Sequence, residues 1–166
     1  RDMTVTSDSE FIKLYPIRWR AGRLVLLDQR KLPAQIRYLH PKKVSEVASA
    51  IRTLAVRGAP AIGIAAAYGV VLGLKSRLAG RGGRTGAKNP KSMEDGVEQD
   101  IQTLQSTRPT AVNLFWALDR MRRRFRRFSA GAVPKQIVAA LEAEAVEIHR
   151  EDEARCAAIA RYGAEL

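Results

Sequence analysis

Residues 56–74, VRGAPAIGIAAAYGVVLGL, determine the fold more than any other stretch of the chain. Small apolar residues fill this stretch, which indicates a helix that other elements surround on all sides. Pro60 suits the first helical position, where its missing N–H costs nothing. We therefore expect a buried helix from Pro60 to about Leu78, in which Gly63 and further glycines permit close backbone approach.

The start of this helix has the features of an anion site. Free backbone amides and the helix dipole favour a phosphate or carboxylate there. Arg57, directly before Gly58, adds a planar and permanently charged guanidinium to those amides. Arg108 stands before Pro109 in the same way, so two helix N-termini led by arginines would converge on one phosphate. Two alternatives stay open: a buried helix without a ligand, and an Arg108 that is only a loop cation.

Composition bounds the class of protein. The chain has 166 residues, of which 46% are apolar, and this suits one hydrophobic core. A formal net charge of +12 fits nucleic acid, an anionic membrane or an anionic substrate, and charge alone does not choose among them. The uncharged stretch between Arg57 and Lys75 is shorter than the roughly 20 residues of a membrane span. A single cysteine and the absence of a recognisable secretory signal favour a cytoplasmic protein without a membrane partner.

The hydrophobic pattern changes period along the chain. Alternating or β-branched runs predict three strands, at 16–20, 23–28 and 34–40, with Ala21 and Gly22 as the hairpin turn between the first two. Spacings of three and four residues predict helices at about 44–55, 60–78, 92–105, 109–129 and 134–162. A glycine-rich basic segment, residues 79–92, predicts a flexible loop.

The predicted fold class is α+β, in a single domain. A small N-terminal antiparallel sheet within residues 1–41 leads into a bundle of about five helices within residues 42–166. The pattern contains no strand–helix–strand unit, so we expect no Rossmann-like parallel sheet in this chain. The glycine spacings match neither a P-loop nor a dinucleotide fingerprint, which argues against kinases and dehydrogenases and against a nucleotide cofactor.

Other chemistry-bearing residues favour structural roles. His40 and His149 lie on different elements without neighbouring ligands, so we expect no metal site. Cys156 falls on the apolar stripe of the last helix and is expected to be a small buried hydrophobe. Asp152 falls on the same stripe, so it should be hydrogen-bonded or mark a break in the helix. Six arginines between Arg120 and Arg127 predict a solvated face, with RNA or acidic lipid as the alternative partner.

Three longer motifs and the final YGAEL point to a family. They are IRWRAGRLVLLDQRKLP at 17–33, IRTLAVRGAPAIGIAAAYG at 51–69 and TRPTAVNLFWALDRM at 107–121. With them the chain resembles the N-terminal domain of the methylthioribose-1-phosphate isomerases of methionine salvage, which are similar to the alpha, beta and delta subunits of translation initiation factor 2B. The resemblance covers nearly the whole chain except the 79–92 loop.

The resemblance implies an aldose–ketose isomerase that converts 5-methylthioribose 1-phosphate into 5-methylthioribulose 1-phosphate as a cytoplasmic homodimer, without a metal or cofactor. It assigns substrate contacts to Arg57, Gly58, Ala59 and Arg108. It places the acid–base cysteine and aspartate in a Rossmann-like domain beyond Leu166, so no catalytic residue is expected here and the chain alone should be inactive. An enolate route and a hydride shift both stay open.

The same resemblance leaves two alternative functions open. A regulatory-subunit-like scaffold of translation initiation factor 2B would share the fold, and arginine-rich helices would suit it. A ribose-bisphosphate isomerase is the enzymatic alternative. The intact Arg57-Gly58-Ala59-Pro60 and Thr107-Arg108-Pro109-Thr110 motifs favour the methylthioribose enzyme, because a scaffold has no need for a paired-arginine site. No nucleic-acid partner is expected.

Overall fold

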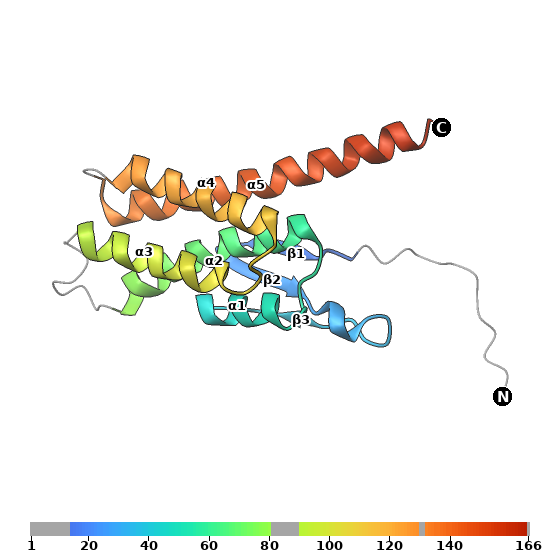
Figure 1. Cartoon of the computed structure of the whole chain (residues 1–166), viewed down its shortest axis with the longest axis horizontal. Helices are drawn as coiled ribbons and strands as arrows, with labels where there is room; N and C mark the ends of the chain where they lie inside the picture. The colour runs from blue at the N-terminus through green and yellow to red at the C-terminus, as the bar shows by residue number, and fades with distance from the viewer. Residues whose placement is uncertain (1–13, 81–89, 130–131, 166) are drawn as a thin grey trace.

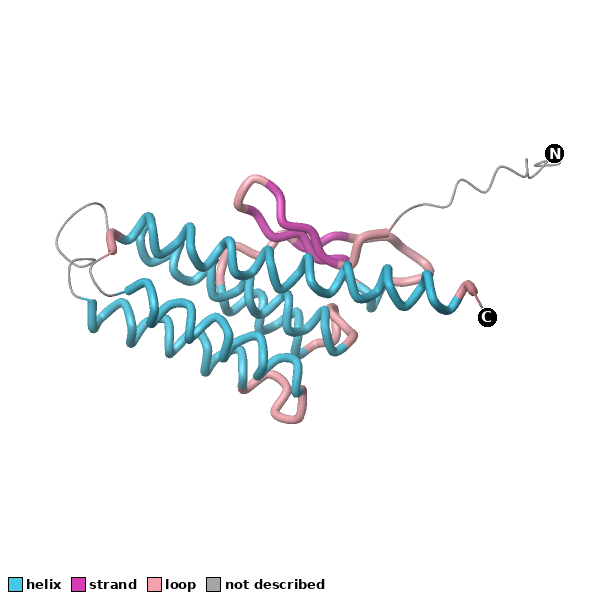
Figure 2. Tube along the Cα trace, turned by 90° about the horizontal axis from the view of Figure 1, so that it is seen from above, coloured by secondary structure: helices cyan, strands magenta, loops and turns pink. Residues whose placement is uncertain are grey.

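The computed structural model describes residues 14–80, 90–129 and 132–165, and in it a small sheet lies on one side of a group of helices (Figures 1 and 2). The strands are β1 (Ile17–Arg20), β2 (Arg23–Leu27) and β3 (Tyr38–Leu39), with a 3-10 turn, η1 (Gln29–Lys31), between the last two. The helices are α1 (Val44–Arg52), α2 (Ala59–Gly80), α3 (Pro90–Gln105), α4 (Val112–Ser129) and α5 (Pro134–Gly163). The predicted α+β class is confirmed.

The sheet is antiparallel with β2 in its centre. Strands β1 and β2 form the expected hairpin, in which Arg20 pairs with Arg23. Ala21 and Gly22 both take positive φ, +50° and +72°. This mirror-image turn matches the twist of the strands, which explains why a two-residue connection suffices.

The third strand is shorter than the predicted 34–40. Only Tyr38 and Leu39 pair with β2. The preceding backbone is committed to a turn, because the N–H of Gln35 donates to the carbonyl of Lys31 at 2.8 Å. Pro33 in that turn has no N–H to offer a ladder.

Helix α2 is the centre of the domain, in contact with α1, α3, α4, α5 and β1. Residues 62–72 are buried throughout, as the small apolar sequence predicts. Within the described residues, α2 is the helix that is long and apolar enough to cross a membrane. Because 72% of that stretch is buried inside the protein, it has the surroundings of a core helix.

The end of α1 and the start of α4 differ from the sequence-based bounds. Helix α1 ends at Arg52, short of the predicted residue 55, because Leu54 adopts a left-handed φ of +62°. Helix α4 begins at Val112, so the prediction that Pro109 opens it is wrong. Residues 108–111 form a turn closed by the Ala111 N–H on the Arg108 carbonyl at 3.1 Å, and proline is favoured at the second position of such a turn.

The predicted 79–92 loop is partly helical. Helix α2 continues to Gly80 and α3 begins at Pro90, so both ends of that segment extend the neighbouring helices. The remainder of the predicted loop lies outside the described residues.

An aromatic stack joins the sheet to the helices. Trp19 of β1 lies parallel to Tyr68 of α2, with 4.6 Å between ring centroids. The indole N–H of Trp19 donates to Glu142 of α5 at 2.8 Å, and Lys75 of α2 donates to the same carboxylate at 2.8 Å. The hydroxyl of Tyr68 lies 3.1 Å from Nδ1 of His149 on α5. Sheet, central helix and last helix are therefore fixed to each other by one polar and aromatic cluster.

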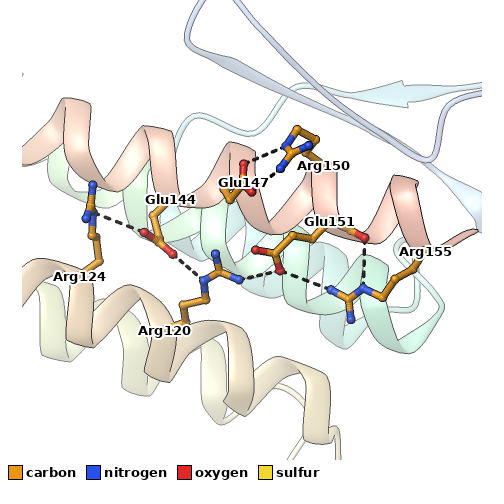
Figure 3. Close-up of polar contacts among 7 residues, drawn as sticks. All are labelled: Arg120, Arg124, Glu144, Glu147, Arg150, Glu151 and Arg155. Carbon is orange, nitrogen blue, oxygen red and sulfur yellow. Dashed lines mark hydrogen bonds and ion pairs between the residues drawn. The ribbon is translucent and has the colours of Figure 1, made fainter.

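The arginine-rich face of α4 lies between two acidic helices. Arg120 contacts Glu144 and Glu151 of α5 (Figure 3), and Arg122 forms a double hydrogen bond with Glu98 of α3 at 2.9 Å. These glutamates hold the pKa of both arginines above the ordinary value. The prediction of a solvated face is therefore wrong for these two arginines, and it holds for the exposed Arg123 and Arg127.

Helix α5 follows its predicted apolar stripe only as far as the body of the protein. The stripe is buried from Ile137 to Ile148. Beyond that point α5 extends past the other helices (Figure 1), so Ile159 is 72% exposed and Cys156 is exposed. The expectation of a buried Cys156 is wrong for this reason. Helix α5 also does not break at Asp152, which is only half-buried because the stripe leaves the core there.

Candidate functional site

The first turn of α2 presents backbone amides to the surface. Gly58 takes a φ of +93°, a conformation that glycine adopts without strain, and this reverses the chain into the helix. The first helical hydrogen bond runs from the Ile62 N–H to the Gly58 carbonyl at 3.0 Å. The backbone N–H groups of Ala59 and Ala61 therefore have no carbonyl acceptor within the helix. Pro60, between them, has no N–H group. All of residues 57–60 are exposed, so an anion can reach this end.

Arg57 lies on the loop that enters α2. Its Nε donates to the carbonyl of Leu54 at 3.2 Å, which folds the side chain back over its own loop. Its carbonyl accepts a hydrogen bond of 3.4 Å from the side-chain amide of Gln29. Leu54 and Gly58, on either side, both have positive φ. For Leu54, which has a side chain, this conformation is a local strain of the kind that occurs at functional sites.

Arg108 lies on the turn that enters α4. It is half-buried, and it directly follows Thr107, whose buried hydroxyl donates to the Leu104 carbonyl at 2.6 Å and closes α3. The first carbonyl of α4 belongs to Ala111, which accepts from Leu114 at 2.9 Å. Thr110 stands one residue ahead of that cap position, inside the turn.

The starts of α2 and α4 pack directly against each other. A Cβ on Gly63 would lie 2.7 Å from the carbonyl oxygen of Asn113 and 3.3 Å from the Cβ of Ala117, so only glycine permits this approach. Arg57 and Arg108 therefore lead two helices that meet at the same end of the bundle (Figure 1). Within residues 14–80, 90–129 and 132–165, no hydrogen bond or ion pair links Arg57 to Arg108.

A pocket of about 230 Å³ opens between the starts of α2 and α4 and the middle of α5. Its walls are mainly apolar, and the exposed Val112 and Trp116 stand on its α4 side. The lining is Pro60, Gly63, Ile64, Val112, Asn113, Trp116, Ala117, Ile148, Asp152 and Arg155. Because Pro60 belongs to the first turn of α2, the pocket begins beside the free amides.

The 28–30 turn was not singled out from the sequence. Asp28 is 0% exposed, and both of its carboxylate oxygens accept from Arg30 at 2.7 Å. The hydrogen bond to the Arg30 side chain holds the pKa of Asp28 below its ordinary value. Arg30 also donates to Thr53 at 3.1 Å, so the pair touches the loop that carries Arg57. An aspartate directly after a buried strand, with an arginine two residues on, is the sequence signal that was available.

Tyr68 and His149 are the other polar pair that sequence reasoning missed. Burial raises the pKa of the Tyr68 hydroxyl, which keeps the phenol neutral. Their cluster with Trp19 lies away from the starts of α2 and α4. Within residues 14–80, 90–129 and 132–165, no three histidine, cysteine or carboxylate side chains gather closely enough to hold a metal ion.

The site brings hydrogen-bond donors and an apolar surface close together. Free amides and a guanidinium are groups that suit an oxyanion, and the pocket beside them is mainly apolar. Among the described lining residues of the pocket, Asp152 is the one carboxylate and none is a histidine or cysteine. Binding rather than acid–base chemistry is what this arrangement supports.

Comparison with known sequences identifies close relatives. The methylthioribose-1-phosphate isomerase of Pseudomonas putida (strain GB-1) is 51% identical over 154 residues, which are 93% of this chain and 40% of that protein. The enzyme of the same name from Azotobacter vinelandii is 50% identical over the same number of residues. The chain thus spans about 40% of the length of the curated relatives that it matches.

Solved structures share the fold. The 5-methylthioribose 1-phosphate isomerase of Pyrococcus horikoshii superposes with a TM-score of 0.72 at 35% identity, covering 82% of this chain and 36% of that one. The delta subunit of translation initiation factor eIF-2B from A. fulgidus superposes with a TM-score of 0.71 at 34% identity, over 84% of this chain and 38% of that one.

A sequence profile of the initiation factor 2 subunit family matches residues 55–166. This match begins just before Arg57 and contains both arginine motifs, and the relatives extend the similarity over 93% of the chain. The chain therefore belongs to the initiation factor 2 subunit family, and its relatives include proteins named methylthioribose-1-phosphate isomerase.

Proposed function

We propose that this chain supplies the substrate-binding part of an isomerase that converts 5-methylthioribose 1-phosphate into 5-methylthioribulose 1-phosphate in methionine salvage. The observation that carries the proposal is the exposed start of α2. There Arg57 precedes the free amides of Ala59 and Ala61, and Pro60 between these two alanines lines an apolar pocket. The relatives of the same name, at about half identity, support the assignment.

The phosphate would bind at the start of α2. A helix N-terminus offers N–H donors and a favourable dipole, and an arginine adds two parallel donors that match phosphate oxygens. Arg57, Gly58 and Ala59 form that end, and Arg108 leads the helix packed against it. These four residues are the proposed substrate contacts.

The apolar pocket would accommodate the methylthio end of the substrate. Ile64, Ala117 and Ile148 line it from three different helices, and all three are buried. A methylthio group is apolar and polarizable, so it is favoured in such surroundings over water. An anion site at one side and an apolar pocket at the other would distinguish this substrate from a sugar that carries two phosphates.

The reaction itself would need groups outside this chain. We propose that the acid–base residues lie in the remaining part of a longer protein, as the relatives' greater length supports. By this proposal the chain alone is inactive.

Three proteins test the proposal: this chain, the remainder of the Pseudomonas putida relative, and a fusion of the two. Conversion of 5-methylthioribose 1-phosphate is expected from the fusion and from neither part. Equal turnover by the chain alone would contradict the assignment of catalysis to the remainder. Ribose 1,5-bisphosphate serves as the competing substrate, and a fusion that prefers it would favour the alternative isomerase.

A scaffold related to translation initiation factor 2B is the second candidate. One observation favours it, the superposition on the delta subunit with a TM-score of 0.71. A fusion that folds and isomerises neither sugar would favour this candidate over an enzyme.

We also propose that the complete protein is a cytoplasmic homodimer that needs no metal or cofactor and binds no nucleic acid. The mass of the fusion in solution tests the dimer. Turnover after treatment with a chelator tests the independence from metal.

A further inference from the structure

The 28–30 turn contacts the 53–58 loop at three places. The backbone N–H of Gln29 donates to the Ala55 carbonyl at 3.0 Å, and its side-chain amide donates to the Arg57 carbonyl at 3.4 Å. Arg30 donates to the hydroxyl of Thr53 at 3.1 Å. The contacts fall at the beginning, middle and end of the loop, so its whole path is tied to the end of β2.

The turn is itself rigidly held. Asp28 is fully buried, and its two oxygens accept hydrogen bonds from Nε and one terminal nitrogen of the Arg30 guanidinium. The Asp28 N–H donates to the carbonyl of Arg37 at 2.8 Å, and the Asp28 side chain also caps η1. A buried carboxylate and a two-point guanidinium contact leave the turn little freedom to move.

The loop needs such support. Leu54 holds a left-handed φ of +62°, a conformation that is unfavourable for a residue with a side chain. Thr53 connects the support to α1, because its hydroxyl donates to the Ser49 carbonyl at 2.8 Å while it accepts from Arg30. The conformation of Leu54 directs its carbonyl to the Nε of Arg57. Removing the external contacts would therefore let Arg57 and the start of α2 relax.

We propose that Gln29 and Thr53 are positioning residues, through which the 28–30 turn fixes the 53–58 loop so that Arg57 and the first amides of α2 face one anion. The inference rests on the proposed function. It adds that the affinity for substrate depends on two side chains that are not among the four proposed substrate contacts.

The experiment uses the fusion with the Pseudomonas putida remainder. The variants Gln29→Ala and Thr53→Val should each raise the KM for 5-methylthioribose 1-phosphate about 5-fold, the change for one hydrogen bond. The control Gln35→Ala, an exposed glutamine in the next segment, should leave KM unchanged. Thr53→Ser keeps the hydroxyl, so it should restore the parental KM.

Two further readouts separate positioning from simple structural support. In the Arg57→Ala background, Gln29→Ala should have almost no added effect on KM, because residues that act through one another are not additive. Amide hydrogen exchange in the 53–58 loop should accelerate about 5-fold in both variants without substrate. A lowered melting temperature with unchanged KM would overturn the proposal, and so would unchanged loop exchange.

Failure of the proposed function has a different signature. If Arg57→Ala itself leaves KM unchanged, the start of α2 is not the substrate site, and the positioning role falls with it. If Arg57→Ala raises KM and the Gln29 and Thr53 variants do not, the site stands and only the positioning role is overturned.

Discussion

Arg57 is the residue on which the proposed site depends. It is exposed, its side chain is folded over the Leu54 carbonyl, and left-handed residues lie on both sides of it. The sequence predicts its charge and its place before a helix. It does not predict the left-handed Leu54, because leucine is a poor residue for that conformation and contacts from distant parts of the chain, among them the 28–30 turn, hold the loop in place.

Replacement of Arg57 by alanine should weaken substrate binding. In the fusion protein, Arg57→Ala is expected to lose about 1.5 to 3 kcal/mol of binding free energy, the range for a hydrogen bond to a charged group. The measurement is KM and, where available, direct titration with substrate. Arg52→Ala, an exposed arginine at the end of α1, is the matched control and should have no effect. An unchanged KM in Arg57→Ala would exclude this residue from the site.

The ion pair of Asp28 and Arg30 should give the protein a pH-dependent stability. Arg30→Met leaves a buried carboxylate without its partner and should lower the free energy of unfolding at neutral pH by about 1 to 2 kcal/mol. The native pKa of Asp28 is below its unfolded value of about 3.9, so the pair stabilises above that pH. Its contribution is lost as the pH falls through the native pKa.

Urea unfolding of the parent and of Arg30→Met between pH 7 and pH 3 checks this expectation. The difference between the two proteins should shrink toward acid pH. Lys31→Met, at the neighbouring exposed position, is the control and should show no such difference. A gap that widens in acid would contradict the assignment to Asp28.

Helix α2 shows what the sequence predicts at the scale of an element. Its burial follows from small apolar residues in every direction, and the glycines mark real close approaches, as Gly63 shows. The start of α4 was not predictable from Pro109, since the same proline favours a turn as readily as a helix. The hydrogen bond from the Ala111 N–H to the Arg108 carbonyl closes the 108–111 turn, and the backbone of Asn113, just beyond it, lies against Gly63 of α2.

Gly63→Ala should separate these two helix starts. The added Cβ would lie 2.7 Å from the backbone oxygen of Asn113, which a rotamer change does not relieve. We expect a loss of about 1 to 3 kcal/mol in unfolding free energy, measured by thermal or urea denaturation. Gly163→Ala meets nothing within 4 Å and should be neutral or slightly stabilising. Equal stability of the two variants would refute the close approach.

The arginines of α4 act as connections between helices. Arg120 contacts two glutamates of α5, and its hydrogen bond to Glu151 contributes most to the raised pKa of the guanidinium (Figure 3). The hydrophobic periodicity of α4 predicts which face of the helix its arginines occupy. It does not predict the acidic residues opposite, because those come from other helices.

Arg120→Leu should therefore destabilise the protein by about 1 to 2 kcal/mol, since it leaves two partly buried glutamates with weaker partners. The exposed Arg123→Leu is the control and should change stability little. Chemical denaturation measures both. A loss in Arg123→Leu equal to that in Arg120→Leu would mean that charge, rather than the contact with α5, is responsible.

At the scale of the molecule, the sequence predicts the sheet and the helices well. It does not predict that the last turns of α5, residues 153–163, are largely exposed. The apolar stripe continues past Ile148 to Ile159, so the sequence predicts burial where this domain has no surface left to cover it. The sequence predicts the charged residues of the proposed site, because they are local in sequence, and their role stays a prediction. It does not predict the pocket, because three distant helices form it.

The free turns of α5 should behave differently in the chain and in the fusion protein. Residues 153–163 have few buried contacts, so their amides should exchange quickly in the chain alone. In the fusion they should become protected, if the remainder packs on Ile159 and Tyr162. Hydrogen exchange with mass analysis measures both states. Equal exchange in the two proteins would show that this end stays exposed in the complete protein.

The chain has two tryptophans, and they occupy very different surroundings. Trp19 lies in the stack with Tyr68 and donates to Glu142, whereas Trp116 is 41% exposed at the pocket. Their fluorescence therefore separates two events. Emission from a Trp116→Phe variant follows the docking of the sheet on the helices during unfolding, while emission from a Trp19→Phe variant reports directly whether the pocket is filled.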